Sequence, residues 1–298
     1  MNKDNVLLIV GASGFVGGEI FNQAGNYYEN VIGSYNENGG KKDLIHIDLS
    51  EFSPEKFSLE LKKFNGTKHA ILCSCVSQID KCFTDPEKSY QINVQNSKKI
   101  LSILVENGFK VAFISTDNVF SNNIKPYIEE DEKYPINLYG SHKDNVENYL
   151  IKNFEDYLIF RLSKVVASYR HPKNPFNEWE HLVKNNTNIL CIKDQLFCPI
   201  SVDDVGKIIL ESLNKGLRGV YHIVGAPILR RDLAGLFTSH FPHYSGKIIE
   251  KELDEFNFLD KRSLNIILDN SKIKKDLKRE ISGMTEVVEK YCLLIPSS

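Results

Sequence analysis

Short apolar runs alternate with longer amphipathic stretches along most of the chain. Residues 6–10 are all apolar, as in a strand that is covered on both faces of a parallel sheet. The clearest helical stretch spans about 88–106 and ends at the stop signal Asn107-Gly108. Strands alternating with helices predict an α/β fold with a doubly wound, mostly parallel sheet. Further runs of strand length are 31–35, 44–47, 69–75, 111–115, 157–162 and 219–224.

A glycine-rich turn follows the first predicted strand directly. Gly11, Gly14 and Gly17 have the spacing that permits a tight turn, close approach of the backbone to a pyrophosphate and close packing of a helix on the strand. The N-terminus of that helix offers free N–H groups and a positive dipole end to the phosphates. The pattern predicts a Rossmann turn that binds a dinucleotide. The expected contacts are Gly11, Ser13, Gly14, Phe15, Val16 and Gly17.

The second and third strands indicate which dinucleotide binds. Residues 31–36 contain no acidic side chain that would bind a ribose 2′-hydroxyl and repel a 2′-phosphate, and Lys41 and Lys42 follow. We therefore expect Ser34 and Asn36 to line the site, with NADP(H) preferred to NAD(H), although the lysines equally suit a solvated surface. Asp48 and Leu49 are expected near the adenine, with capping of the next helix as the alternative role of Asp48.

Tyr139 and Lys143 are four residues apart, so they share one face of a predicted helix. An ammonium beside a phenol favours the phenolate and lowers the pKa of the phenol, which suits proton transfer near neutral pH. Ser115-Thr116 ends a predicted strand, where a hydroxyl can meet a substrate carbonyl. The predicted catalytic residues are therefore Thr116, Tyr139 and Lys143. His142 falls on a neighbouring helix face and is expected to be exposed.

These motifs, in this order, resemble the extended short-chain dehydrogenase/reductase superfamily. Within it, the dTDP-4-dehydrorhamnose reductase family is similar at Ser-Thr-Asp-Asn-Val-Phe (115–120) and at residues 126–131 and 135–140. The similarity covers nearly the whole chain. It continues at Glu147, Asp194-Gln195, 219–222, Arg262 and 268–272.

The resemblance implies an NAD(P)H-dependent oxidoreductase of the CH-OH class that reduces a 4-keto group on a nucleotide-linked 6-deoxysugar, in the synthesis of cell-surface polysaccharide sugars. It assigns proton donation to Tyr139, the nicotinamide ribose to Lys143 and polarisation of the carbonyl to Thr116. Further cofactor contacts it implies are Tyr139, Lys143, Cys73, Ser74, Cys75 and Asn93, the last with a helix-surface amide as the alternative. Implied substrate contacts are Ser77, Asp117, Asn118, Val119, Phe120, Lys164, Gln195 and Arg262.

Two departures from the family fall in its sugar pocket. Asn118 stands where the family has a tyrosine, and Lys164 stands where it has a tryptophan. Losing two aromatic walls removes stacking and apolar area, while the replacements offer hydrogen bonds and a positive charge. We expect an active enzyme whose sugar differs from that of the family.

The strand–helix alternation loosens after Leu162, which predicts a second domain. Residues 1–163 are expected to form the NAD(P)-binding Rossmann domain, with 195–225 returning to it. Residues 164–194 and 226–298 are expected to form a smaller, mixed α/β substrate domain, with Trp179 in its core. That domain would cover the carboxyl edge of the sheet, where ligands bind in open α/β folds.

Composition mainly excludes other classes of protein. With 37 Lys+Arg and 39 Asp+Glu, the net charge of -2 counts against a nucleic-acid partner. No apolar run reaches the roughly 18–20 residues that span a membrane, and the start does not resemble a signal peptide, so we expect a cytoplasmic protein. The six cysteines and eight histidines lack zinc-site spacing, which predicts free thiols and no metal. The oligomeric state stays open, a homodimer included.

Two other functions also remain open on the residues. A sugar-nucleotide epimerase or dehydratase would use the same Tyr–Lys pair with a retained cofactor. Asp117 suits a dehydratase, but the glutamate that follows it in those enzymes is absent. A non-catalytic, NADP-binding regulatory subunit is the third reading, against which the presence of Thr116, Tyr139 and Lys143 counts.

Overall fold

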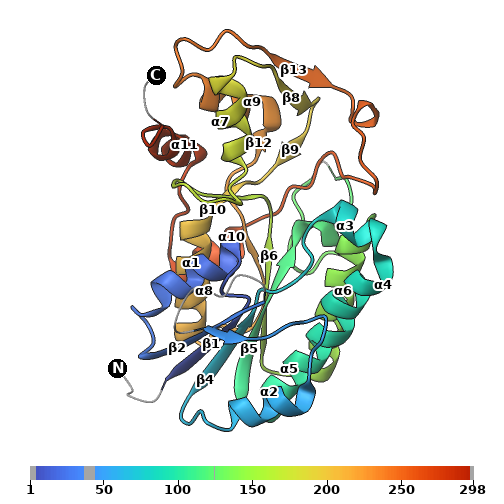
Figure 1. The fold of residues 1–298 in the computed structure, drawn as a ribbon, viewed down its shortest axis with the longest axis vertical. Coiled ribbons are helices and arrows are strands. Elements are labelled where there is room, and N and C mark those ends of the chain that lie inside the picture. The colour runs from blue at the N-terminus through green and yellow to red at the C-terminus, as the bar shows by residue number, and fades with distance from the viewer. Residues whose placement is uncertain (1–4, 37–43, 124, 296–298) are drawn as a thin grey trace.

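Seven parallel strands form the central sheet of the protein (Figure 1). The computed structural model describes residues 5–36, 44–123 and 125–295. The strand order β3-β2-β1-β4-β5-β6-β11 reverses direction at β1, which is the dinucleotide-binding arrangement of doubly wound sheets, so the predicted fold class is confirmed. The strands are β1 (Val6–Val10), β2 (Asn30–Tyr35), β3 (Leu44–His46), β4 (Lys68–Leu72), β5 (Phe109–Thr116), β6 (Tyr157–Leu162) and β11 (Gly219–Ile223).

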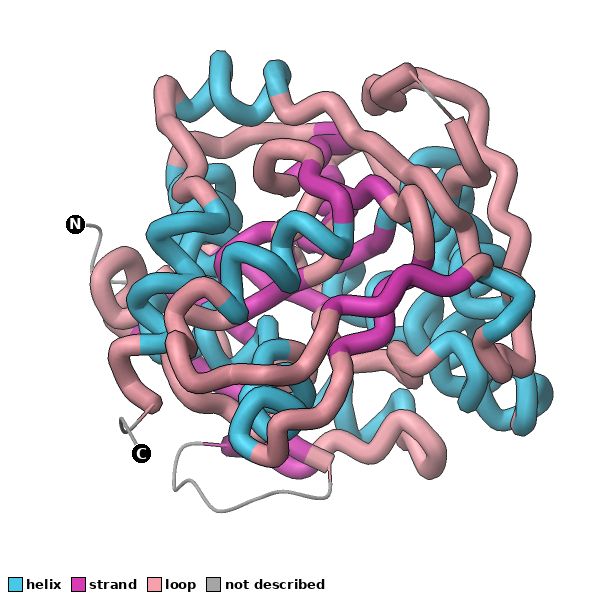
Figure 2. Tube along the Cα trace, turned by 90° about the horizontal axis from the view of Figure 1, so that it is seen from above, coloured by secondary structure: helices cyan, strands magenta, loops and turns pink. Residues whose placement is uncertain are grey.

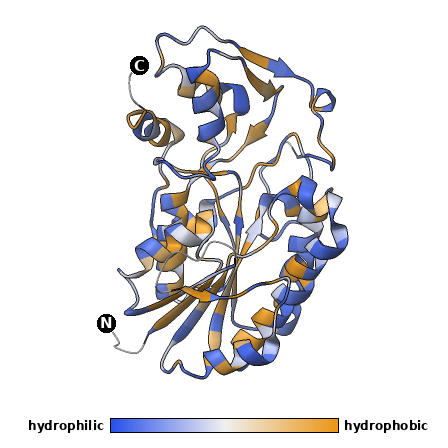
Figure 3. Cartoon of the chain, viewed as in Figure 1, coloured by the Kyte–Doolittle hydropathy of each residue, from blue (hydrophilic) through white to orange (hydrophobic). Residues whose placement is uncertain are grey.

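Helices cover both faces of this sheet, as the view from above shows (Figure 2). Leu7 and Ile9 of β1 enter one core, while Leu8 and Val10 enter the other. Burial on both faces explains why β1 is apolar at every position, whereas the flanking helices mix polar and apolar residues, as Figure 3 displays. The first core is covered by α1 (Phe15–Ala24), α8 (Val202–Asn214) and α10 (Ser271–Leu277), and the second by α2 (Pro54–Leu61), α5 (Ser97–Glu106) and α6 (Leu138–Asn153).

The predicted helix at 88–106 is interrupted by a π-helical segment. Two short helices, α3 (Ile79–Thr84) and α4 (Pro86–Tyr90), precede this segment, Gln91–Asn96, and α5 follows it. The wider turn buries both Asn93 and Asn96. Asn96 donates a hydrogen bond of 2.7 Å to the carbonyl oxygen of Leu49, so the segment ties this flank to the loop after β3.

A smaller lobe lies above the carboxyl ends of the strands (Figure 1). Its core joins Phe176, Trp179, Phe237 and Tyr291, and Trp179 is buried as expected. Single turns of 3-10 helix occur at Asp117–Val119 and Leu253–Glu255. The remaining elements are β7 (Val165–Val166), α7 (Phe176–Lys184), β8 (Ile189–Ile192), β9 (Leu196–Phe197), β10 (Ile200–Ser201), β12 (Ile228–Leu229), α9 (Arg230–Thr238), β13 (Ile248–Lys251) and α11 (Met284–Cys292).

Part of the C-terminal stretch packs with the central sheet rather than with the lobe. Ile273 and Leu277 of α10 enter the first core, and Asp276 accepts a hydrogen bond of 2.9 Å from the Tyr221 hydroxyl of β11. The apolar pair spaced by four residues gives α10 a buried face beside β11 and α8. The division into two domains remains a prediction, and α10 shows that a boundary at 226 does not separate the cores.

All six cysteines are free thiols. Within the described ranges, no three His, Cys, Asp or Glu side chains are grouped so as to hold a metal ion. None of the helices in those ranges is both long and apolar enough to cross a bilayer.

Candidate active site

The turn after β1 has the geometry that only glycines allow. Gly11 adopts φ +97°, and a Cβ at this position would lie 2.8 Å from the Ser74 nitrogen. A Cβ at Gly17 would lie 2.3 Å from the carbonyl oxygen of Gly11. The Gly11 N–H donates to the Ser34 hydroxyl at 2.9 Å, so the end of β2 supports the turn.

A cleft of about 970 Å³ opens above this turn and continues to the ends of β4 and β5 and to α6. Its position at the carboxyl ends, beside the strand-order reversal, is where doubly wound folds bind ligands. The structure brings most of the predicted site residues to this one cavity. Those lining it are Gly11, Ser13, Gly14, Phe15, Val16, Gly17, Ser34, Asn36, Cys73, Ser74, Cys75, Ser77, Thr116, Tyr139, Lys143, Lys164 and Arg262.

Asp48, Leu49 and Asn93 lie outside the lining of the cleft. The Asp48 carboxylate accepts hydrogen bonds of 2.7 Å from the backbone and hydroxyl of Ser50, which caps a turn rather than a helix. Asn93 clamps the loop after β4, because its amide accepts from the Val76 N–H at 2.7 Å and donates to the Val76 carbonyl at 2.9 Å. Asn93 is therefore placed to hold the loop that carries Cys73, Ser74 and Cys75.

Residues 117–120 turn mostly away from the cleft. Val119 and Phe120 are fully buried, and the Phe120 ring stacks on Tyr127 with centroids 4.1 Å apart. The Asn118 amide donates to Asp117 at 2.8 Å and accepts from Asn137 at 3.1 Å, so it holds a loop instead of replacing an aromatic wall. Gln195, on the turn before β9, is also absent from the lining.

Thr116, Tyr139 and Lys143 form one wall of the cleft. The Lys143 ammonium donates to the Ile114 carbonyl at 2.7 Å and lies 5.9 Å from the centroid of the Tyr139 ring. The Thr116 hydroxyl donates to Asp117 at 3.1 Å, so a substrate carbonyl would compete with Asp117 for this proton.

Tyr139 differs from the sequence prediction in its acidity. Burial raises its pKa well above the usual value, and Cys75 and Asp117 add to the effect. The expected lowering by Lys143 is wrong for this arrangement, because the phenol is enclosed and the ammonium is bonded to Ile114. Burial also raises the pKa of Asp117. Tyr139 is therefore a protonated phenol at neutral pH, the form that can give a proton to a substrate.

His142 is buried, which corrects the expectation of an exposed side chain. Its ring lies 5.7 Å from that of Tyr90, and its Nδ1 is 3.5 Å from the Asn93 amide nitrogen. The reason is that α3 and the π-helical segment pack on this face of α6.

A buried network of charges lies behind the catalytic wall. Glu147, one turn after Lys143 on α6, binds the Arg161 guanidinium at 2.8 Å, Lys133 at 3.1 Å and the Ser115 hydroxyl. Arg161 also donates to the Glu129 carbonyl at 3.1 Å. Burial alone would raise the pKa of Glu147, but Arg161 and Lys133 outweigh it and lower that pKa. The network fixes α6 against β5 and β6, the elements that carry the wall.

The loop at 167–175 adds contacts that the sequence did not reveal. Its His171 ring packs on Phe15 of the glycine turn, with centroids 4.7 Å apart, and its Tyr169 hydroxyl donates to Glu19 of α1. Lys173 lines the cleft together with Tyr35 and Asn36. Lys41 and Lys42, the cations predicted for the 2′-phosphate, lie outside the described residues. No local spacing predicts Lys173, because it comes from a segment far along the chain.

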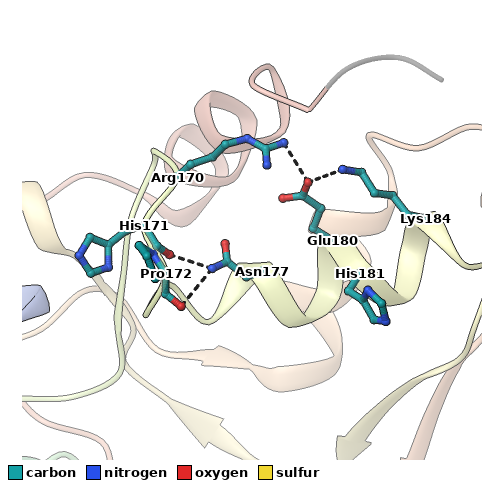
Figure 4. Close-up of a pocket in the computed structure, with 7 residues that line it drawn as sticks. All are labelled: Arg170, His171, Pro172, Asn177, Glu180, His181 and Lys184. Atoms are coloured by element: carbon teal, nitrogen blue, oxygen red, sulfur yellow. Dashed lines mark hydrogen bonds and ion pairs between the residues drawn. The ribbon is translucent and has the colours of Figure 1, made fainter.

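A second cavity of about 420 Å³ shares Pro172 with the cleft (Figure 4). Glu180 points into it and accepts from Arg170 at 2.9 Å and Lys184 at 2.6 Å. The Asn177 amide donates to the His171 carbonyl at 2.8 Å and to that of Pro172 at 3.3 Å. The polar side chains of this cavity therefore bind one another and the loop at 167–175. They hold in place the loop that borders the cleft.

Comparisons with known proteins agree with the geometry. A family model described as the RmlD substrate binding domain matches residues 5–293. A dTDP-4-dehydrorhamnose reductase of Sinorhizobium fredii is 29% identical over 164 residues. That alignment covers 52% of this chain and 55% of the relative, so it spans about half the length of each.

Solved structures match over more of the chain. The crystal structure of a hypothetical dTDP-4-dehydrorhamnose reductase from Sulfolobus tokodaii superposes with a TM-score of 0.80 and 29% identity, covering 90% of this chain and 93% of the other. A dTDP-4-dehydrorhamnose reductase from Bacillus anthracis, solved in complex with NADP, superposes with a TM-score of 0.81 and 20% identity, covering 98% and 99%.

Proposed function

The chain belongs to the RmlD substrate binding domain family, among the NAD(P)-dependent oxidoreductases of the extended short-chain dehydrogenase/reductase superfamily, and from that premise we propose its reaction. It is an NADP(H)-dependent reductase of a nucleotide-linked 4-keto-6-deoxysugar. The proposal depends mainly on one observation: Thr116, Tyr139 and Lys143 line the same cleft as the glycine turn. Lys164 in that cleft supports a sugar different from the one that names the family.

Thr116, Tyr139 and Lys143 have different roles in the reduction of a carbonyl. The dinucleotide, when bound, supplies the hydride that adds to the carbonyl carbon. Tyr139 gives its phenolic proton to the carbonyl oxygen, and its raised pKa keeps that proton available at neutral pH. Thr116 donates to the same oxygen once the carbonyl displaces Asp117, which polarises the bond. Lys143 would hold the nicotinamide ribose of the bound dinucleotide.

The preference for NADP(H) over NAD(H) is supported by the charge of the adenosine end. Ser34, Tyr35 and Asn36 end β2 without an acidic side chain, and Lys173 lines the same cavity. A lysine there favours a 2′-phosphate, whereas an acid would repel it. The NADP found in the Bacillus anthracis structure agrees with this choice.

The proposal includes a setting in the cell. The reaction takes place in the cytoplasm and supplies sugars for cell-surface polysaccharide, with a nucleotide sugar as the partner molecule and no nucleic acid. The free thiols, two of them on the cofactor loop, are those of a reducing compartment. A homodimer is the proposed assembly, which light scattering of the purified chain checks.

The test follows NADPH absorbance with dTDP- and GDP-linked 4-keto-6-deoxyhexoses. Stoichiometric oxidation of NADPH supports the reductase, whereas turnover without net oxidation would indicate an epimerase or dehydratase. Inertness toward the whole panel would indicate a regulatory subunit. The variant Tyr139→Phe should lower kcat about 10²- to 10⁴-fold, as loss of one proton donor predicts, while the Kd of NADPH changes far less. Full activity in that variant would overturn the mechanism.

A further inference from the structure

Lys164 is an unpaired cation in the wall of the cleft. It follows β6, and its backbone carbonyl accepts the N–H of Ile200 at 3.0 Å, so the position of its backbone is fixed. Its ammonium has no acceptor at hydrogen-bond or ion-pair distance within residues 5–36, 44–123 and 125–295. Its side chain is reached by solvent from within the cleft.

Two other cations of the cleft already have partners. The Arg262 guanidinium binds the Asp80 carboxylate at 2.7 Å, and the Lys143 ammonium binds the Ile114 carbonyl at 2.7 Å. Burial lowers the pKa of Lys164, Arg230 and Arg262 add to the lowering, and Glu178 and Asp117 oppose it. Because this exposed ammonium lines the cleft without an acceptor among the described residues, its position suits an anion brought by the ligand.

The place of Lys164 indicates which end of the ligand that anion belongs to. Lys164 follows β6, next to Thr116 at the end of β5, and the Asp117 carboxylate is among the charges that act on it. The glycine turn follows β1, which lies three strands away from β6 in the sheet. Lys164 is therefore on the side of the reacting sugar, and the dinucleotide phosphates belong to the glycine turn.

We propose that Lys164 binds an anionic oxygen of the sugar-nucleotide substrate and thereby determines which substrates are accepted. This inference rests on the proposed function and deepens it. In a nucleotide-linked 6-deoxysugar, the oxygens with this charge belong to the diphosphate that links sugar and nucleoside. An ammonium on a flexible stem can reach a diphosphate oxygen. An aromatic side chain at this position would offer that oxygen no partner.

The test compares Lys164→Met, which keeps the length of the stem, with Lys164→Arg, which keeps the charge. Steady-state assays use the nucleotide sugars that the wild type reduces. Lys164→Met should raise the KM for the sugar nucleotide about 10- to 100-fold, the range for one hydrogen bond to a charged group, with the KM for NADPH unchanged. Lys164→Arg should recover most of this loss. An unchanged KM in Lys164→Met would overturn the inference while leaving the reductase assignment intact.

Two further measurements test the diphosphate as the source of the oxygen. Lys164→Met should weaken competitive inhibition by dTDP or GDP about 10-fold or more, and unchanged inhibition by both nucleotides would overturn this assignment. The wild-type KM should also rise as the pH increases and Lys164 loses its proton, and this rise should be absent in Lys164→Met. A wild type that reduces no nucleotide sugar would instead contradict the proposed function, and dTDP and GDP binding would then test Lys164 directly.

Discussion

Charged side chains lie both behind and in front of the wall formed by Thr116, Tyr139 and Lys143. Those behind it are paired, and Lys164 in the cleft is not. Behind the wall, Glu147 and Arg161 are fully buried and each has several partners, including a direct contact of 2.8 Å. In the cleft, Lys164 has no partner among the described residues, and the Thr116 hydroxyl donates to Asp117 at 3.1 Å. The paired charges of Glu147 and Arg161 hold α6 against β5 and β6. The unpaired charge of Lys164 is available to bind a ligand.

Breaking the buried pair should have the largest effect on stability. Glu147→Gln leaves Arg161 buried without its counter-charge, so the free energy of unfolding should fall by about 3–5 kcal/mol, measured by urea denaturation. The matched control is Glu60→Gln, which removes a surface pair with Lys63 at 2.7 Å and should cost about 1 kcal/mol or less. If both variants lower the free energy of unfolding equally, the buried pair has no special role in stability.

The next effect concerns the glycine turn. Gly17→Ala places a Cβ 2.3 Å from the Gly11 carbonyl oxygen, which must move, and overpacking of this kind costs about 1–3 kcal/mol. The Kd of NADPH, followed by fluorescence titration, should rise about 10-fold or more. Gly25→Ala is the control, since its Cβ meets nothing within 4 Å and its φ of -59° is helical. If both variants bind NADPH as the wild type does, the turn does not hold the dinucleotide.

Two buried histidines predict a pH dependence of stability. Burial lowers the pKa of His222 to about 3, with Arg161 adding to it, and lowers that of His69 to about 4. The unfolded chain takes up protons near pH 6.5 and the folded chain does not. Stability that is fully present above about pH 6.5 is therefore lost as the pH falls toward 4, by about 1.4 kcal/mol per pH unit for each histidine. Urea midpoints between pH 7 and 4.5 measure this slope, and His69→Gln should make it shallower. A slope unaffected by that change would contradict the assignment.

The smallest effect is expected at the second cavity. Lys184→Met removes one of the partners of Glu180, but 47% of the Lys184 side chain is exposed, so the cost should be about 1 kcal/mol or less. Arg170 and the Tyr291 hydroxyl, at 2.9 and 2.7 Å, still bind Glu180. The kinetic constants should not change. A large rise in either KM would mean that this cavity takes part in binding.

Local spacing was sufficient for the parts of the site that a single element carries. The glycine turn needs only Gly11, Gly14 and Gly17 after a buried strand, and Tyr139 and Lys143 need only one helical turn. The doubly wound, mostly parallel sheet followed from the alternation of strands and helices, whereas the order of the strands came only from the structure.

What the sequence could not supply depends on packing between distant segments. His142 is buried because the π-helical segment covers its face, and the apolar spacing of 88–106 did not distinguish that segment from an ordinary helix. Asn118 turns toward Asn137, a partner nineteen residues later. The raised pKa of Tyr139 comes from burial and from Cys75 and Asp117 on the loops after β4 and β5, which no spacing of Tyr and Lys describes.

The contacts of loop 167–175 with the first turns of α1 have a mechanical consequence. To swing away from the sheet, the upper lobe must slide the His171 ring off Phe15 and break the hydrogen bond from Tyr169 to Glu19. An aromatic contact and a hydrogen bond together hold on the order of 1–3 kcal/mol. These two contacts tether the loop to the helix that begins at the glycine turn, so the side of the cleft that carries Lys173 is held next to Phe15.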